Sequence, residues 1–129
     1  DLGIAHVVTF EGHVPHHQMG KYYKKADIFV NMSRAEGFAT VCLEAMSSGL
    51  AIISSKVGGF EDAIKNGMNG YIVDQEDYKA LAKNVITLLN DKQKLEKIRL
   101  RARLDAEQYY NWDTAIIPKY LGVYTKLLK

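Results

Sequence analysis

The chain has 129 residues, of which 47% are hydrophobic and 25% charged, and its formal net charge is +2. This composition is typical of one globular domain and excludes disordered and fibrous proteins. The net charge excludes neither nucleic acid nor membrane, but it supplies no broad basic footprint, so no nucleic-acid partner is predicted. The start is unlike a signal peptide, no apolar run approaches the roughly 20 residues of a membrane span, and the single cysteine cannot form an internal disulfide. We therefore expect a cytoplasmic protein.

Four short runs of apolar and β-branched residues alternate with segments of helical period, which is typical of a parallel sheet with crossover helices. The predicted strands cover residues 6–10, 27–31, 50–55 and 70–74. Helices are predicted over 16–26, 38–48 and 61–66. Gly49 is expected to end the second helix in the left-handed conformation, and Gly58 and Gly59 are expected to form a turn before the third.

The segment after residue 74 is predicted to be entirely helical. Its predicted apolar faces comprise Leu81, Val85, Leu88 and Leu89, then Leu95, Ile98, Ala102 and Ala106, then Tyr120, Leu121, Tyr124, Leu127 and Leu128. Trp112 is expected to be a core residue that anchors the last helix. The predicted fold over residues 1–129 is therefore one doubly wound parallel α/β domain with a helical C-terminal cap, in which ligands bind beyond the carboxyl ends of the strands.

The stretch EGFATVCLE, residues 36–44, follows the second predicted strand and carries a glutamate at each end. Eight residues of helix advance roughly 12 Å. The carboxyl pairs of glycoside hydrolases lie only about 5 to 9.5 Å apart, so a hydrolase is disfavoured. Glu36 and Glu44 are better suited to accepting hydrogen bonds from hydroxyl groups at the two ends of a long ligand.

The helix N-terminus between these glutamates is expected to bind an anion, because its first amides lack intrahelical acceptors. The predicted donors are the backbone amides of Ala39, Thr40 and Val41. Gly37 has no Cβ, which would allow a sharp turn and close approach to a ligand. Hydroxyls at both ends and negative charge between them match a nucleoside diphosphate sugar.

The segment EGFATVCLEAMSSGLAII resembles the E-x7-E signature of the GT4-type (group 1) retaining glycosyltransferases of the GT-B fold. VVTFEGHV, YYKKADIFVNMS, VGGFEDAIKNGMNGYIV and the closing YLGVYTKLL also resemble that family's segments in order and spacing. The resemblance implies the Rossmann-like, donor-binding half of such an enzyme, with a UDP- or GDP-sugar as donor and no metal.

The resemblance also implies roles for individual residues. Glu36, with the backbone near Gly37 and Phe38, would contact the transferring sugar, either as nucleophile or, as we favour, as a positioning group. Glu44 would bind the ribose, the amides of Ala39, Thr40 and Val41 would face the pyrophosphate, and His13 and Val14 would border the base.

Two positions depart from the family pattern, since Ala39 replaces the second glycine of EGFG and Ala51 replaces a proline. Ala39 adds a methyl group beside the expected sugar site, which bears on the choice of sugar. The family's pyrophosphate clamp lies on earlier strands and its acceptor site on an N-terminal domain. We therefore expect an inactive fragment whose parent transfers a sugar to a glycan or a lipid-linked acceptor. A lipid-linked acceptor would bring that parent to the inner membrane face.

Other readings of the chain remain open. The runner-up enzyme is another GT-B protein, such as a sugar-nucleotide epimerase or a phosphorylase, and a noncatalytic α/β interaction module is a third reading. His13, His16 and His17 have no cysteine or carboxylate at ligand spacing, so no metal site is predicted. Cys42 is expected to be a buried small apolar residue rather than a nucleophile.

Overall fold

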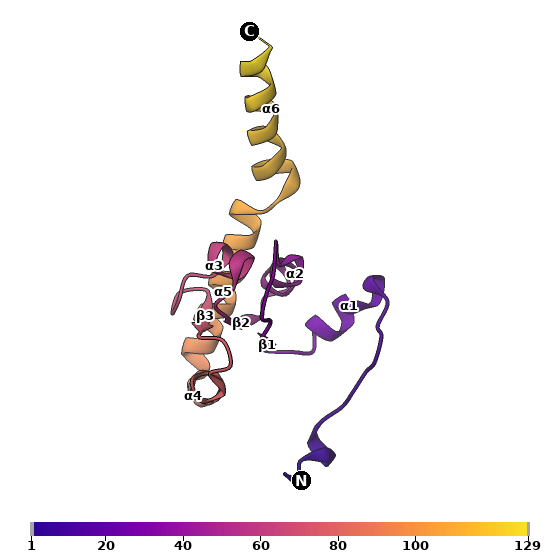
Figure 1. The fold of residues 1–129 in the computed structure, drawn as a ribbon, viewed down its shortest axis with the longest axis vertical. Helices are drawn as coiled ribbons and strands as arrows, with labels where there is room; N and C mark the ends of the chain where they lie inside the picture. The colour runs from indigo at the N-terminus through magenta and orange to yellow at the C-terminus, as the bar shows by residue number, and fades with distance from the viewer. Residues whose placement is uncertain (1, 129) are drawn as a thin grey trace.

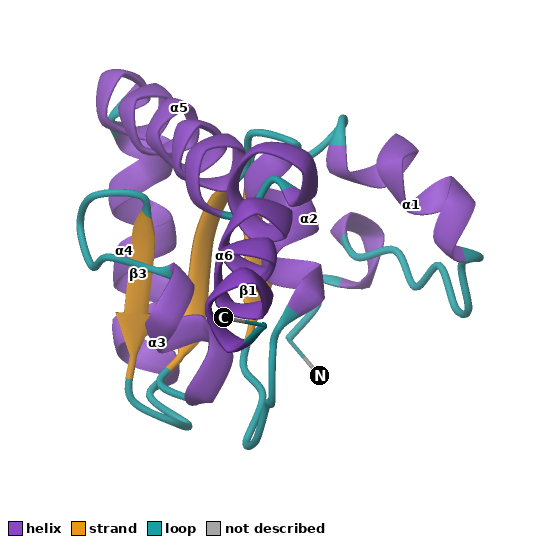
Figure 2. Cartoon of the chain, turned by 90° about the horizontal axis from the view of Figure 1, so that it is seen from above, coloured by secondary structure: helices purple, strands orange, loops and turns teal. Residues whose placement is uncertain are grey.

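The computed structural model describes residues 2–128, which form an open sheet of three parallel strands with helices on both faces (Figures 1 and 2). The elements in chain order are a 3₁₀ turn at Ala5–Val7, α1 His16–Tyr23, β1 Ile28–Asn31, α2 Thr40–Ser47, β2 Ala51–Ser55, α3 Gly58–Ala63, β3 Gly70–Val73, α4 Tyr78–Asn90, α5 Lys92–Tyr109, a π-helical turn at Trp112–Ile116 and α6 Ile117–Leu127.

The central strand β2 carries the core. The strand order is β1-β2-β3, with Ile53 of β2 opposite Val30 of β1 and Tyr71 of β3, and every residue of β2 is buried. Successive side chains of a strand point to opposite faces. Ile52 therefore belongs to a core with α2 and α3, whereas Ile53 belongs to a second core with α4 and α5.

Helix α5 contributes to both cores, and its predicted apolar stripe is confirmed. Leu95 and Ile98 pack into the core with Ile53, and Ala102 and Ala106 pack into the core with α2 and α3. The helix begins after Asp91, whose carboxylate accepts a hydrogen bond from a backbone amide three residues later, at 2.9 Å. This long helix thus contributes side chains to both hydrophobic cores.

The first predicted strand, residues 6–10, is wrong. The structure has a 3₁₀ turn at Ala5–Val7 and then exposed backbone that joins no strand of the described sheet, and Phe10 is 93% exposed. A strand needs a neighbour to pair its N–H and C=O groups. The other three predicted strands are confirmed.

The predicted end of α2 is confirmed, because Gly49 has φ of 77°. The third predicted helix begins earlier than expected, at Gly58, so Gly58 and Gly59 are its first residues and not a separate turn. Leu89 was predicted on the inner face of its helix, but it is 56% exposed. The buried residue of α4 is its neighbour Leu88.

The last helix does not pack on the domain. α6 projects away from the sheet (Figure 1), and none of its described residues is buried. Trp112, predicted to be in the core, is 68% exposed, and Tyr120 and Tyr124 are also exposed. The predicted amphipathic helix therefore exists, but its apolar stripe is exposed, and of its residues Tyr120 lines a hollow with Phe38 and Tyr110.

Candidate functional site

The first glutamate of EGFATVCLE lies just beyond the carboxyl end of β1. The hydroxyl of Ser33 lies 2.7 Å from Oε1 of Glu36, and the amide of Ser33 donates to Oδ1 of Asn31 at 2.9 Å. The hydroxyl of Ser55 in turn donates to the carbonyl of Ser33, which links this loop to β2. Glu36 is half-buried and is held at the edge where parallel α/β folds bind ligands.

The turn after Glu36 packs directly against the start of α3. A Cβ on Gly58 would lie 2.5 Å from the carbonyl oxygen of Glu36, and a Cβ on Gly59 would lie 2.5 Å from that of Gly37. The amide of Gly59 donates to the same Gly37 oxygen at 2.9 Å. The two glycines are therefore needed because backbone meets backbone at this contact.

Gly37 itself shows no such need. Its φ is not positive, and a Cβ added there would meet no described atom within 4 Å. The chain does bend at Gly37 and Phe38, as expected, but in a backbone conformation that does not require glycine. Any requirement for glycine at position 37 comes from something outside the chain's own described atoms.

The N-terminus of α2 offers fewer amides than predicted. The helix begins at Thr40 rather than at Phe38, after the buried Ala39, which provides no side-chain cap. The amide of Thr40 already donates to the carbonyl of Phe38 at 2.9 Å. Within residues 2–128, the amides of Ala39 and Val41 have no hydrogen-bond acceptor; Val41 is 36% exposed and Ala39 only 4%, so Val41 is the more accessible of the two donors.

The second glutamate, Glu44, lies in the second turn of α2 and is joined to α1. Its Oε1 lies 3.0 Å from Nε2 of His16, and its Oε2 accepts a hydrogen bond from the hydroxyl of Tyr23 at 2.9 Å. The predicted base-binding residues His13 and Val14 precede α1, and the histidine that reaches Glu44 is instead His16.

Sequence reasoning thus missed the partners of both glutamates. His16 was considered only as a possible metal ligand, and no role in the site was predicted for Tyr23. The available signal was their spacing, because residues seven apart lie on the same face of a helix. Ser33, two residues after β1, had no signal beyond its position at the carboxyl end of a predicted strand.

Two hollows include Glu44 in their lining. One, of about 210 Å³, is lined by His16, Met19, Gly20, Tyr23, Glu44, Ser47 and Ser48. The other, of about 430 Å³, lies between α2 and the end of α5 and includes Phe38, Tyr110 and Trp112. Phe38 is 59% exposed, and its ring lies 6.4 Å from that of Tyr110. Glu44 therefore lines both hollows.

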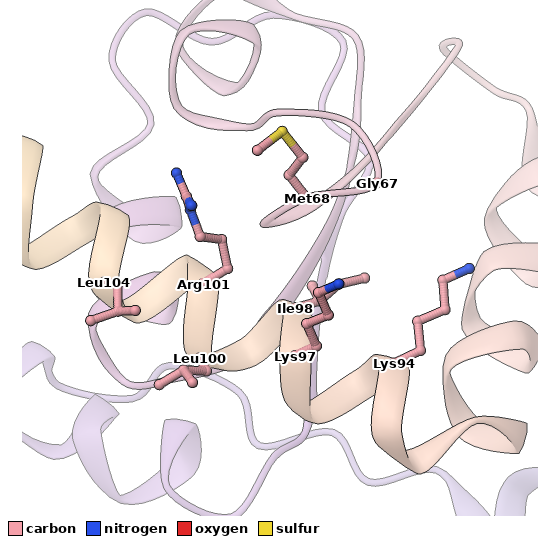
Figure 3. A pocket seen from close by; sticks show the side chains of 8 residues that line it. All are labelled: Gly67, Met68, Lys94, Lys97, Ile98, Leu100, Arg101 and Leu104. Carbon is pink, nitrogen blue, oxygen red and sulfur yellow. The ribbon is translucent and has the colours of Figure 1, made fainter.

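A further hollow, of about 450 Å³, lies away from the predicted site (Figure 3). It runs between the loop at Gly67 and Met68 and one side of α5, and it combines Leu100 and Leu104 with basic side chains. None of the residues predicted to bind the donor lines this hollow.

Cys42 is a buried apolar residue, as predicted. It is fully buried in α2, and burial raises the pKa of its thiol to about 12. The described residues contain no group of three or more His, Cys, Asp or Glu side chains arranged to hold a metal ion. No helix within residues 2–128 is both long enough and apolar enough to span a bilayer.

The fold and the site define a parallel α/β domain with two carboxylates and a helix N-terminus at the carboxyl end of its sheet. The family model described as "Glycosyl transferases group 1" matches residues 1–105. D-inositol 3-phosphate glycosyltransferase 1 of Catenulispora acidiphila is 31% identical over 129 residues, which are 100% of this chain and 30% of that protein.

Solved structures agree with this family match. Sucrose-phosphate synthase from Thermosynechococcus elongatus superposes with a TM-score of 0.86 and 30% identity, over 97% of this chain and 31% of that chain. Anabaena HepE, solved in complex with UDP-glucose, gives a TM-score of 0.69 and 23% identity, over 83% of this chain and 29% of that chain, and this likeness concerns the fold alone.

The chain belongs to the group 1 glycosyl transferases, and its fold is that of a GT-B glycosyltransferase domain. The resemblance carried by EGFATVCLEAMSSGLAII is thereby confirmed for family and fold. The chain spans 30% of the length of the curated relative.

Proposed function

We propose that this chain is the donor-binding domain of a retaining, metal-independent glycosyltransferase that uses a nucleoside diphosphate sugar. The observation that carries the proposal is the order of groups along one turn and helix. Glu36, the unpaired amides of Ala39 and Val41, and Glu44 follow one another from the end of β1 into α2. The order of acceptor, donor and acceptor matches sugar, pyrophosphate and ribose.

Each group has a role that its chemistry allows. The ionised carboxylates of Glu36 and Glu44 only accept hydrogen bonds, so they suit hydroxyl groups of the sugar and the ribose. The amides of Ala39 and Val41 and the positive end of the α2 dipole suit the diphosphate. As the sugar leaves, negative charge grows on the diphosphate, and these fixed dipoles stabilise it without reorganising.

Gly37, Phe38 and Thr40 contribute less to the proposed site than the two glutamates. Gly37 and Phe38 would contact the sugar through the backbone, and the absence of any internal need for glycine at position 37 is consistent with a ligand at that point. The Thr40 amide is committed to Phe38 and is not counted among the donors. Glu36 positions the transferring sugar, and its contact with Ser33 holds the carboxylate in place for this role.

UDP-sugars and GDP-sugars are the proposed donors, and HepE, solved with UDP-glucose, has the same fold. His13 and Val14 are assigned to the base. The acceptor, a sugar or a lipid-linked sugar in polysaccharide biosynthesis, is assigned to parts of the parent enzyme outside this chain. We also propose a cytoplasmic location, and we expect no transfer by the chain alone.

The test is a titration of the chain with UDP, GDP and ADP, in which binding is monitored through the amide chemical shifts. Uridine, which lacks phosphate, is the control ligand. We expect the amides of Ala39 and Val41 to shift with the diphosphates but not with uridine. Glu44→Gln should weaken binding by about tenfold, because a hydrogen bond to a charged group is lost.

The matched control is Glu96→Gln, which changes an exposed helical carboxylate that contacts Arg99. It should bind nucleotide like the parent chain. Shifts confined to other parts of the domain, or equal affinity in the Glu44 and Glu96 variants, would contradict the proposed donor site and favour a noncatalytic module.

A further inference from the structure

The two oxygens of the Glu44 carboxylate have unlike partners. Oε2 accepts a hydrogen bond from the hydroxyl of Tyr23, whose side chain is only 6% exposed. Oε1 lies 3.0 Å from Nε2 of His16. The side chain of His16 is 85% exposed, and the side chain of Glu44 is 30% exposed. One oxygen is therefore hydrogen-bonded to a buried residue and the other lies beside an exposed one.

The core fixes Tyr23 but not His16. Tyr23 belongs to the core with α2 and α3, and its ring meets that of Phe29 in β1 edge-to-face, with centroids 6.3 Å apart. Met19, on the same side of α1, packs against this core. His16 lies at the first residue of α1, where its imidazole is exposed and has Glu44 as its partner.

We propose that Tyr23 is the positioning residue for Glu44, and that His16 occupies the ligand-facing oxygen Oε1 until a vicinal diol displaces it. This inference rests on the proposed donor site. Tyr23 donates to Oε2 and so fixes the rotation of the carboxylate. Glu44, Tyr23 and His16 all line the hollow of about 210 Å³, and in this proposal Oε1 meets the diol there.

The ionisation of Tyr23 suits a permanent donor. Burial, and then the hydrogen bond to Glu44, raise the pKa of its hydroxyl to about 12. The hydroxyl therefore keeps its proton at any pH at which the enzyme works. A carboxylate whose one oxygen is held by such a donor presents its other oxygen in a constant direction, which favours a diol of fixed geometry such as the ribose 2′- and 3′-hydroxyls.

The two partners should have opposite effects on affinity. Tyr23→Phe keeps the buried ring and removes only the hydroxyl, so binding of UDP should weaken by about tenfold. His16→Ala removes a competitor for Oε1, so binding should strengthen by about two- to fivefold, the range of an exposed ion pair. A site in which both residues were structural supports would lose affinity in both variants.

The chain provides a matched control for each change. Tyr22 is the neighbouring tyrosine, exposed, and its hydroxyl donates to Oε2 of Glu11 at 3.1 Å. His17 is the neighbouring histidine, also exposed, and its ring contacts Gln18. Tyr22→Phe and His17→Ala should leave nucleotide affinity unchanged.

The decisive measurement is the ratio of affinities for UDP and for 2′,3′-dideoxy-UDP, taken for the chain and its variants by chemical-shift titration. We expect the parent chain to prefer UDP, Glu44→Gln to lose the preference, and Tyr23→Phe to reduce it. General damage to the fold would lower both affinities and leave the ratio unchanged. The ring nitrogens of His16 should shift with UDP but not with the dideoxy compound.

The outcomes separate the two ideas. If the parent chain does not distinguish the two nucleotides, the ribose contact of Glu44 fails and this inference fails with it. If Glu44→Gln abolishes the preference while Tyr23→Phe keeps it in full, the donor site stands and the positioning role of Tyr23 is wrong. Weaker binding in His16→Ala would overturn the displacement of His16.

Discussion

The close contact between α3 and the turn after Glu36 predicts a strong effect of Gly59→Ala. The new Cβ would lie 2.5 Å from the Gly37 oxygen, 2.7 Å from the Ala39 nitrogen and 3.0 Å from the Phe38 Cα, all of them backbone atoms. Because no flexible side chain can move aside, the turn or the start of α3 must shift by about 0.5 Å or more. Such overpacking costs about 1–3 kcal/mol of the free energy of unfolding.

Urea and thermal unfolding measure this cost, and each kcal/mol should lower Tm by roughly 4 °C in a domain of this size. The amides of Phe38 and Ala39 should also shift. The control is Gly20→Ala in α1, where an added Cβ meets nothing within 4 Å and should stabilise by about 0.5–1 kcal/mol. Equal stability of Gly59→Ala and the parent chain, with unchanged amide shifts, would refute the reasoning.

The buried core of β2 and α2 predicts two further results. Ser54 and Ser55 are both fully buried, but within residues 2–128 the hydroxyl of Ser54 has no partner whereas that of Ser55 donates to Ser33. Ser54→Ala should therefore be neutral or stabilising and Ser55→Ala should cost about 1 kcal/mol in urea unfolding, and the reverse order would contradict these hydrogen bonds. Burial raises the pKa of the Cys42 thiol from 9.0 to about 12, so the folded state favours the neutral form. The contribution of this thiol to the free energy of unfolding is complete below the unfolded-state pKa of 9.0. As the pH rises from there towards the folded-state pKa of about 12, the contribution falls by about 1.4 kcal/mol per pH unit. Cys42→Ala should remove that loss between pH 9 and 10, and urea midpoints that fall equally in both proteins would count against it.

The strand pattern illustrates what local sequence predicts well. DIFVN, LAIISS and GYIVD form adjacent strands, because each finds a neighbour in the sheet and buries apolar residues. HVVTF is similarly rich in apolar and β-branched residues but joins no strand of the described sheet. Composition therefore predicts the tendency to form a strand, and only the presence of a partner decides the outcome.

The same distinction applies to the helices. The period of α5 predicted its buried face, because that face meets core on both sides of the sheet. The period of α6 predicted an apolar stripe equally well, yet Tyr120 and Tyr124 are exposed. The spacing of apolar residues shows which face a helix would bury but not whether another surface covers it.

By itself, the sequence determined the family, the parallel α/β class and the segment that carries both glutamates, because these depend on residue types at short spacing. Only the tertiary structure decided which amides at the start of α2 are unpaired and which side chains hold Glu36 and Glu44. Ser33 reaches Glu36 from the end of β1, and Tyr23 and His16 reach Glu44 from α1. Contacts across 21 and 28 residues depend on how α1 packs beside α2, which no local pattern records.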